Sequence, residues 1–166
     1  MLKKNVYSLF VLALFLPSCQ RRVDTQKEEQ AIKVVIEAEK KGFFDKSLEE
    51  MAATWVQDSS SAKVFMSRDG EIDLLGWPKI NDQSRQEIPR HDSTYQNARL
   101  QFSNYQFHIY ETSAWAIFKA DWNWSRGGQP EHLQQTRITA FEKVDGKWKF
   151  TLMAIYNVPP EERKGH

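Results

Sequence analysis

The first recurring pattern along the chain is helical. Apolar side chains recur every three or four residues after Thr25, a spacing that places them on one face of a helix. Thr25 and Glu28 match a capping box, which predicts that the helix begins there, and Gly42 predicts its end through a left-handed backbone conformation. A second amphipathic stretch, capped by Asp45 and ending at Trp55, predicts another short helix. The face of the first helix comprises Ala31, Ile32, Val35, Ile36 and Glu39.

Beyond these helices the period changes to two, which is typical of strands. Short strands are predicted over Lys63–Ser67 and Glu71–Leu75, followed by a helix with Pro78 in its first turn. Four long strands follow from Ala98 onward, with Asp145-Gly146 as the turn of the last hairpin. One face of the second long strand carries Ala114, Ala116, Phe118, Ala120, Trp122 and Trp124. One face of the last strand carries Trp148, Phe150, Leu152, Ala154 and Tyr156.

This order of elements predicts an α+β domain over residues 25–159, in which N-terminal helices pack against a curved antiparallel sheet. The chain has 166 residues, which is room for a single domain with short extensions. Its 23 basic and 22 acidic residues leave no excess positive charge for binding phosphates, so we expect no nucleic-acid partner. A single cysteine excludes an intramolecular disulfide and a cysteine-based zinc cluster.

That cysteine lies at the end of an N-terminal export signal. Lys3 and Lys4 precede a short apolar run over 6–16, which is too short to span a bilayer as a permanent helix. The sequence Leu16-Pro17-Ser18-Cys19 resembles the lipobox of bacterial lipoproteins, which implies cleavage after residue 18 and lipid attachment to Cys19. The alternatives are an ordinary signal peptide that happens to contain a cysteine, or an N-terminal membrane anchor.

The lipobox implies a protein of the bacterial cell envelope that is anchored to a membrane by its N-terminal lipid, with its domain outside the cytoplasm. Residues 1–18 are then the signal peptide and residues 19–24 a polar tether of a few residues. Residues 160–166 form a polar tail after the domain.

Three motifs connect the domain to a known superfamily. They are Trp55-Val56-Gln57-Asp58, Gly76-Trp77-Pro78-Lys79-Ile80, and the stretch from Arg137 to Phe150 that contains the Asp-Gly turn followed by Trp148. With the order of elements, they resemble the nuclear-transport-factor-2-like (NTF2-like) superfamily, in its SnoaL-like branch. The resemblance spans roughly 25–159 and implies a cone whose wide end opens into a pocket. It implies no reaction, because this fold is used by isomerases, cyclases, dehydratases and non-catalytic binders.

The residues that serve catalysis in some relatives are missing. Ketosteroid-isomerase-like members place a carboxylate base where this chain has Met66 or Ser67, neither of which can accept a proton in that role. Relatives with a histidine on the final strand would have it near Leu152. Asp58 remains as a candidate base, with a solvated helix-end carboxylate as the alternative. We assign no catalytic residue, and we expect neither a metal nor a cofactor, because the four histidines are scattered.

Large aromatic side chains near the predicted mouth are the more informative feature. Trp122, Trp124 and Tyr156, with Trp55 and Asp58, are the candidate residues of a pocket for a small apolar or sugar-like ligand. The alternative is that the rings are ordinary core. A non-catalytic ligand-binding or partner-binding module is therefore the first hypothesis, a SnoaL-like enzyme (isomerase, dehydratase or hydrolase) the second, and a structural module the third. A buried titratable group that faces the pocket would favour the enzyme.

The opposite face of the sheet is predicted to be a contact surface for another protein molecule. If the even-numbered side chains of the second long strand are buried, Trp115 and Ile117 are left on the outer face. Exposed large apolar side chains on neighbouring sites indicate a covered surface. We therefore expect a homodimer formed through the outer sheet face.

Overall fold

The computed structural model describes residues 23–68, 70–88 and 96–159. Cys19 and the polar tail lie outside the described residues. The helices are α1 (Thr25–Phe44), α2 (Leu48–Ala53) and α3 (Trp77–Glu87). The strands are β1 (Ala62–Ser67), β2 (Gly70–Leu75), β3 (Gln96–Ile109), β4 (Ser113–Arg126), β5 (Gln129–Val144) and β6 (Lys147–Asn157). Within the described part of the chain, no helix is long and apolar enough to cross a bilayer.

The start of α1 differs from the predicted capping box. Asp24, not Thr25, is the N-cap residue, and its carboxylate accepts a hydrogen bond from the backbone N–H of Lys27 at 3.2 Å. The Glu28 carboxylate does not turn back to the helix start. It accepts hydrogen bonds from Lys143 and Trp148, so α1 is joined to the sheet through its first turn.

The junction between α1 and α2 was also predicted incorrectly. Gly42 lies inside α1, which continues to Phe44, and Ser47 instead of Asp45 caps α2. A Cβ atom on Gly42 would lie 2.7 Å from the backbone nitrogen of Met51. Glycine is therefore required at this position by the close approach of α2, not by a left-handed backbone.

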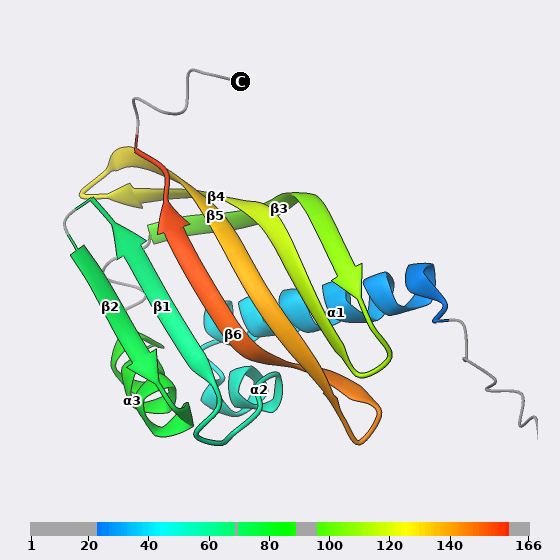
Figure 1. The fold of residues 1–166 in the computed structure, drawn as a ribbon. Coiled ribbons are helices and arrows are strands. Elements are labelled where there is room, and N and C mark those ends of the chain that lie inside the picture. The colour runs from blue at the N-terminus through cyan, green and yellow to red at the C-terminus, as the bar shows by residue number, and fades with distance from the viewer. Residues whose placement is uncertain (1–22, 69, 89–95, 160–166) are drawn as a thin grey trace, which may run out of the picture.

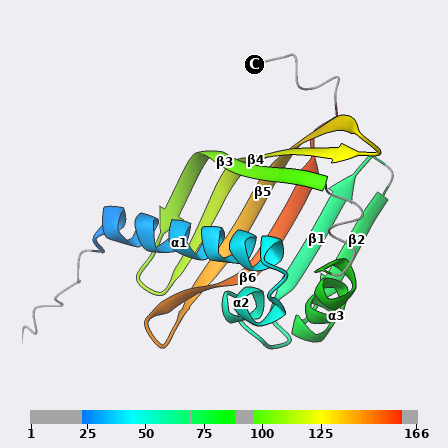
Figure 2. The ribbon, with the colours of Figure 1, turned by 180° about the vertical axis from the view of Figure 1, so that it is seen from behind.

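The six strands form one curved sheet in the order β2-β1-β6-β5-β4-β3, and the three helices cover one of its faces (Figures 1 and 2). All neighbours are antiparallel except β1 and β6, which pair in parallel from Ala62 opposite Leu152 to Met66 opposite Tyr156. Asp145 and Gly146 both have positive φ, as the predicted hairpin turn requires. The α+β fold class, with N-terminal helices on a curved sheet, is confirmed.

A bulge in β6 changes which of its side chains face the helices. Phe141 pairs with Phe150 but Ala140 pairs with Leu152, so Thr151 has no partner on β5. An extra residue in a strand turns every later side chain to the opposite face. The prediction that Leu152, Ala154 and Tyr156 share a face with Trp148 and Phe150 is therefore wrong. The buried side chains after the bulge are Met153 and Ile155.

The core lies between the helices and the concave face of the sheet. Its largest fully buried side chains are Trp55, Phe118, Phe141 and Phe150, joined by Ile32, Ile36 and Ile80 from the helices. The convex face carries no helix in the described part of the chain, and on it Trp115 and Ile138 are 41% and 42% exposed.

Candidate functional site

A cavity of about 250 Å³ opens between the concave face of the sheet and the helices. Side chains of α1, α2 and α3 form one side, and those of β1, β3, β4, β5 and β6 form the other. Its apolar lining consists of Phe43, Met51, Phe65, Leu100, Trp122, Trp124, Leu133, Met153 and Ile155. The cavity is larger than the roughly 150 Å³ that accommodates a benzene-sized molecule in an apolar core.

Two of the five predicted pocket residues line this cavity. Trp122 and Trp124 end the inward-facing row of β4, where both side chains are half-buried. The Trp122 ring packs edge-on against Phe43 of α1, with the ring centroids 5.9 Å apart. Their place at the cavity follows from the strict alternation of β4, whose register with β5 has no bulge.

The other three predicted pocket residues lie elsewhere. Trp55 is only 1% exposed and packs against Phe150, with ring centroids 5.2 Å apart, so it belongs to the core. Tyr156 follows the bulge in β6 and lies on the convex face. Asp58 accepts hydrogen bonds from the backbone N–H and hydroxyl of Ser60 at 2.7 and 2.6 Å, and these bonds lower its pKa. Its carboxylate stabilises an exposed turn.

Three charged side chains that the sequence did not single out are buried at the cavity. Glu39 of α1, Lys63 of β1 and Arg137 of β5 are 6%, 8% and 4% exposed, and all three line it. Glu39 and Lys63 form an ion pair, with Oε1 and Nζ 3.9 Å apart. Buried charges are rare unless they are paired, so the cavity is an electrostatically unusual place in this fold.

The sequence did contain a signal for these residues. Glu39 occupies a position on the apolar face of α1, where a carboxylate conflicts with the pattern. Arg137 occupies an inward-facing position of β5, between the buried Gln135 and Thr139. A charged side chain in a buried row is the feature that would have identified the site.

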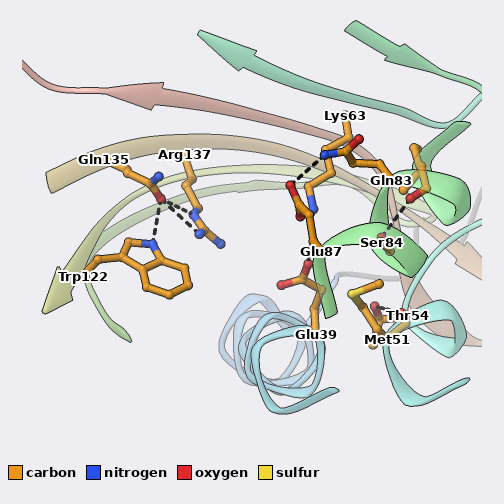
Figure 3. Close-up of polar contacts among 11 residues, drawn as sticks. Glu39, Met51, Thr54, Lys63, Gln83, Ser84, Glu87, Trp122, Gln135 and Arg137 are labelled. Atoms are coloured by element: carbon orange, nitrogen blue, oxygen red, sulfur yellow. Dashed lines mark hydrogen bonds and ion pairs between the residues drawn. The ribbon is translucent and has the colours of Figure 1, made fainter. Parts of the chain in front are cut away.

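Around Arg137 three N–H donors converge on a single oxygen. Nε and Nη2 of Arg137 donate to Oε1 of Gln135 at 3.3 and 3.1 Å, and Nε1 of Trp122 donates to the same atom at 3.0 Å (Figure 3). The amide nitrogen of Gln135 in turn donates to Asn157 at 3.0 Å. The guanidinium also lies over the ring of Phe102, 5.2 Å from its centroid. Burial lowers the pKa of Arg137 below its ordinary value.

The wall formed by α3 contributes a further polar group. Glu87 lines the cavity, and its carboxylate accepts a hydrogen bond from the side-chain amide of Gln83 at 2.8 Å (Figure 3). Ser84, also in the lining, donates its hydroxyl to the backbone oxygen of Ile80 at 2.8 Å. Among the described residues, no group of three or more histidine, cysteine, aspartate or glutamate side chains is arranged to hold a metal ion.

The arrangement offers two kinds of chemistry. Its aromatic and aliphatic walls can enclose a small apolar body, and its buried charged groups can orient a polar substituent. The Glu39 carboxylate can also accept a proton, and the Lys63 ammonium can donate one. Met66 and Ser67, near which the sequence resemblance placed the base of ketosteroid-isomerase-like proteins, are not part of the lining. The carboxylates of this cavity are those of Glu39 on α1 and Glu87 on α3.

Comparison with solved structures identifies the fold. An NTF2-like superfamily protein from Salmonella enterica has a TM-score of 0.66 and 16% identity, over 86% of this chain and 99% of its own. A protein from Streptomyces avermitilis, provisionally named a dehydratase of the NTF2-like family, has a TM-score of 0.67 and 8% identity, over 81% and 99%. An NTF2-like protein with a cystatin-like fold from Novosphingobium aromaticivorans has a TM-score of 0.65 and 11% identity, over 86% and 90%.

By sequence, no protein-family model and no curated protein matches the chain. The structural similarities establish that the chain has the NTF2-like fold, which is also described as cystatin-like.

Proposed function

We propose that this protein is a lipid-anchored protein of the bacterial cell envelope whose SnoaL-like domain binds a small, largely apolar ligand. The observation that carries the binding role is the cavity of about 250 Å³ with Trp122 and Trp124 in its wall. Aromatic rings provide a large contact area and lose little conformational entropy, which favours the binding of an apolar molecule in an existing cavity.

A screen of small molecules against the full chain in detergent tests the binding role. Ligands of the cavity should raise the melting temperature of the wild type and quench its tryptophan fluorescence. Trp124→Ala should lose most of both effects, whereas Trp115→Ala, on the convex face, should keep them. Hits that bind Trp124→Ala as well as they bind the wild type would place binding outside the cavity and contradict the proposal.

A second candidate function is an acid–base enzyme of the SnoaL-like kind. It is favoured by the Glu39 and Lys63 pair, because buried titratable groups at a cavity are the feature that distinguishes an enzyme from a simple binder. Glu39→Gln keeps the size of the side chain but removes the base. If wild type converts a ligand found in the screen and Glu39→Gln binds that ligand without converting it, the protein is an enzyme.

The lipid anchor is proposed from Cys19 and the residues before it. A thiol is required for attachment of the diacylglycerol group, and the chain has a single cysteine. In a bacterial host, Cys19→Ser should no longer incorporate a fatty-acid probe or partition with the membrane fraction. Equal labelling of the variant and the wild type would contradict the anchor and leave the cavity proposal unaffected.

A second copy of this chain is the partner we propose for the convex face. Ile117 and Ile138 are opposite each other on β4 and β5, and Trp115 lies two residues away along β4. The His108 ring stacks on Trp115 with 5.3 Å between centroids, which adds a second ring to this patch. Trp115→Glu should convert a dimer of residues 20–166 into a folded monomer. A wild-type monomer in sedimentation at tens of micromolar would contradict the dimer.

A further inference from the structure

The hydrogen bonding of Arg137 is incomplete in a specific way. A guanidinium has five N–H donors, and those of Arg137 that bond within the protein, on Nε and Nη2, both go to Oε1 of Gln135. That oxygen already accepts a hydrogen bond from Trp122. An amide oxygen has two lone pairs, so three donors exceed what it satisfies well. The site is therefore rich in donors and short of acceptors.

No carboxylate of the described residues neutralises this guanidinium by direct contact. Glu39 is close enough to favour the charged form of Arg137, but its ion pair is with Lys63. A fully buried cation without a paired anion is costly, and proteins normally pair or neutralise such a group. A neutral amide oxygen is a weak substitute for a carboxylate in this position.

Cations outnumber acids in the lining of the cavity. Its lining contains the cations Lys40, Lys63, Arg126 and Arg137 but only the acids Glu39 and Glu87. Lys40 is paired with Glu37 outside the lining, and Lys63 with Glu39. Arg126 is exposed and Glu87 only half-buried, so the buried charges of the lining are Glu39, Lys63 and Arg137. These three sum to one positive charge, and Arg137 is the member without a paired carboxylate, which favours a monoanion as its partner.

We propose that the ligand of this cavity is a small organic carboxylate, whose carboxylate accepts hydrogen bonds from the Arg137 guanidinium while its apolar body lies against Trp122 and Trp124. The inference rests on the proposed ligand-binding function and names the chemical class of that ligand. The planar fork of arginine matches a carboxylate in a two-bond geometry. The ring of Phe102 lies against the guanidinium on one side.

Matched pairs of acid and amide test this assignment on the full chain in detergent. Phenylacetate is compared with phenylacetamide, and hexanoate with hexanamide, by tryptophan fluorescence and calorimetry; inorganic phosphate is titrated separately. Within a pair the body is the same and only the charge differs. We expect each acid that fits to bind about ten- to a hundredfold more tightly than its amide, as for a hydrogen bond to a charged group. The preferred pair then shows whether the body is aromatic or aliphatic.

Variants of Arg137 test whether this residue causes the preference for the acid over the amide. Arg137→Met should bring the acid and the amide to similar affinity while it keeps binding of the amide. Arg137→Lys keeps the charge without the fork and should retain only part of the preference, which gives a second result if the methionine variant fails to fold. Arg99→Met removes an exposed arginine of β3 outside the cavity and should leave the preference unchanged.

Each outcome has a distinct meaning. Acids preferred by the wild type and not by Arg137→Met support the proposal. Acids and amides of equal affinity, or amides bound more tightly, overturn the carboxylate assignment but leave a ligand-binding cavity. Phosphate bound while the acids are not overturns the assignment in favour of an inorganic anion. No binding of any acid, amide or phosphate at millimolar concentration overturns both this inference and the binding function on which it rests.

Discussion

At the end of the concave face near the β5–β6 hairpin, the Glu28 carboxylate accepts hydrogen bonds from Lys143 and from Nε1 of Trp148, both at 2.7 Å. At the other end, which contains the cavity, Arg137 and Trp122 share one amide oxygen. At the hairpin end, a carboxylate accepts hydrogen bonds from an ammonium and an indole N–H, so these polar groups satisfy one another. The cavity end leaves a cation short of acceptors.

Whether a charged group has all its hydrogen-bond partners within the protein distinguishes a structural polar contact from a binding site. A charged group whose partners are supplied by its own chain ties elements together, as Glu28 ties α1 to the sheet. A buried charge whose partners are incomplete lowers the stability of the empty protein and becomes satisfied when a complementary ligand arrives. Phe141 and Phe150 pack together beside the hairpin end, with ring centroids 4.7 Å apart, although Glu28, Lys143 and Trp148 also line a more open hollow between α1 and the hairpin.

The largest expected effect is at the hairpin end. Trp148→Ala removes a ring that is 4% exposed and takes a hydrogen-bond donor from Glu28. We expect a loss of about 3–5 kcal/mol in the free energy of unfolding, a large share of what a small domain possesses. Chemical denaturation measures it. A loss below about 1.5 kcal/mol would show that the hairpin end is not the tightly packed part of the domain.

The junction of α1 and α2 comes next. Gly42→Ala places a methyl group 2.7 Å from the backbone nitrogen of Met51, so α2 must move. We expect a loss of about 1–3 kcal/mol in the free energy of unfolding. Met51 also lines the cavity, so ligand affinity should fall as well. Val34→Ala, at an exposed position of the same helix, is the control and should change the free energy of unfolding by less than about 0.5 kcal/mol.

Truncations at the cavity end should lower the free energy of unfolding less than Trp148→Ala does, and they should weaken ligand binding more. Trp122→Ala and Trp124→Ala remove half-buried rings beside existing empty space, so each should lower the free energy of unfolding by only about 1–2 kcal/mol while weakening ligand binding. Tyr156→Ala, on the convex face, should leave binding unchanged. If the two tryptophan variants lose as much stability as Trp148→Ala, their rings are core and the pocket hypothesis is wrong.

The smallest effect is the pH dependence of the Glu28 contact. The hydrogen bond from Lys143, together with that from Trp148, lowers the pKa of Glu28 below its ordinary 4.5, against the opposing effect of burial. The stability that this carboxylate contributes is therefore complete above pH 4.5 and is lost as the pH falls through the lowered pKa.

The variant Glu28→Gln measures the stability that the ionised Glu28 carboxylate contributes. It should lower the free energy of unfolding by about 1 kcal/mol at pH 7 and make stability less dependent on pH between about 3 and 5. Denaturation curves at several pH values measure both. An equal acid dependence in the variant and the wild type would assign the acid sensitivity to other carboxylates.

Short-range patterns in the sequence were enough to predict the class of fold. The alternation in β4 and the Asp145-Gly146 turn depend on the backbone geometry of a few neighbouring residues, and both were predicted correctly. These signals are local because side-chain period and turn conformation are properties of the backbone itself.

The candidate site was only partly predictable from the same patterns. Trp122 and Trp124 were found because β4 keeps a regular alternation up to the cavity. Tyr156 was misplaced because a single unpaired residue, Thr151, reverses the faces of β6, and no local signal marked that bulge. Trp55 was misplaced because the distinction between a core ring and a pocket ring depends on what packs over it.

By itself, then, the sequence determined the periods of the helices and strands, their order, and the turn of the last hairpin, since each depends on contacts between near neighbours. Only the tertiary structure decided that β1 pairs in parallel with β6, and that Glu39, Lys63 and Arg137 meet at one cavity. These residues come from α1, β1 and β5, far apart in the chain. Their meeting depends on the curvature and register of the whole sheet, which no short segment encodes.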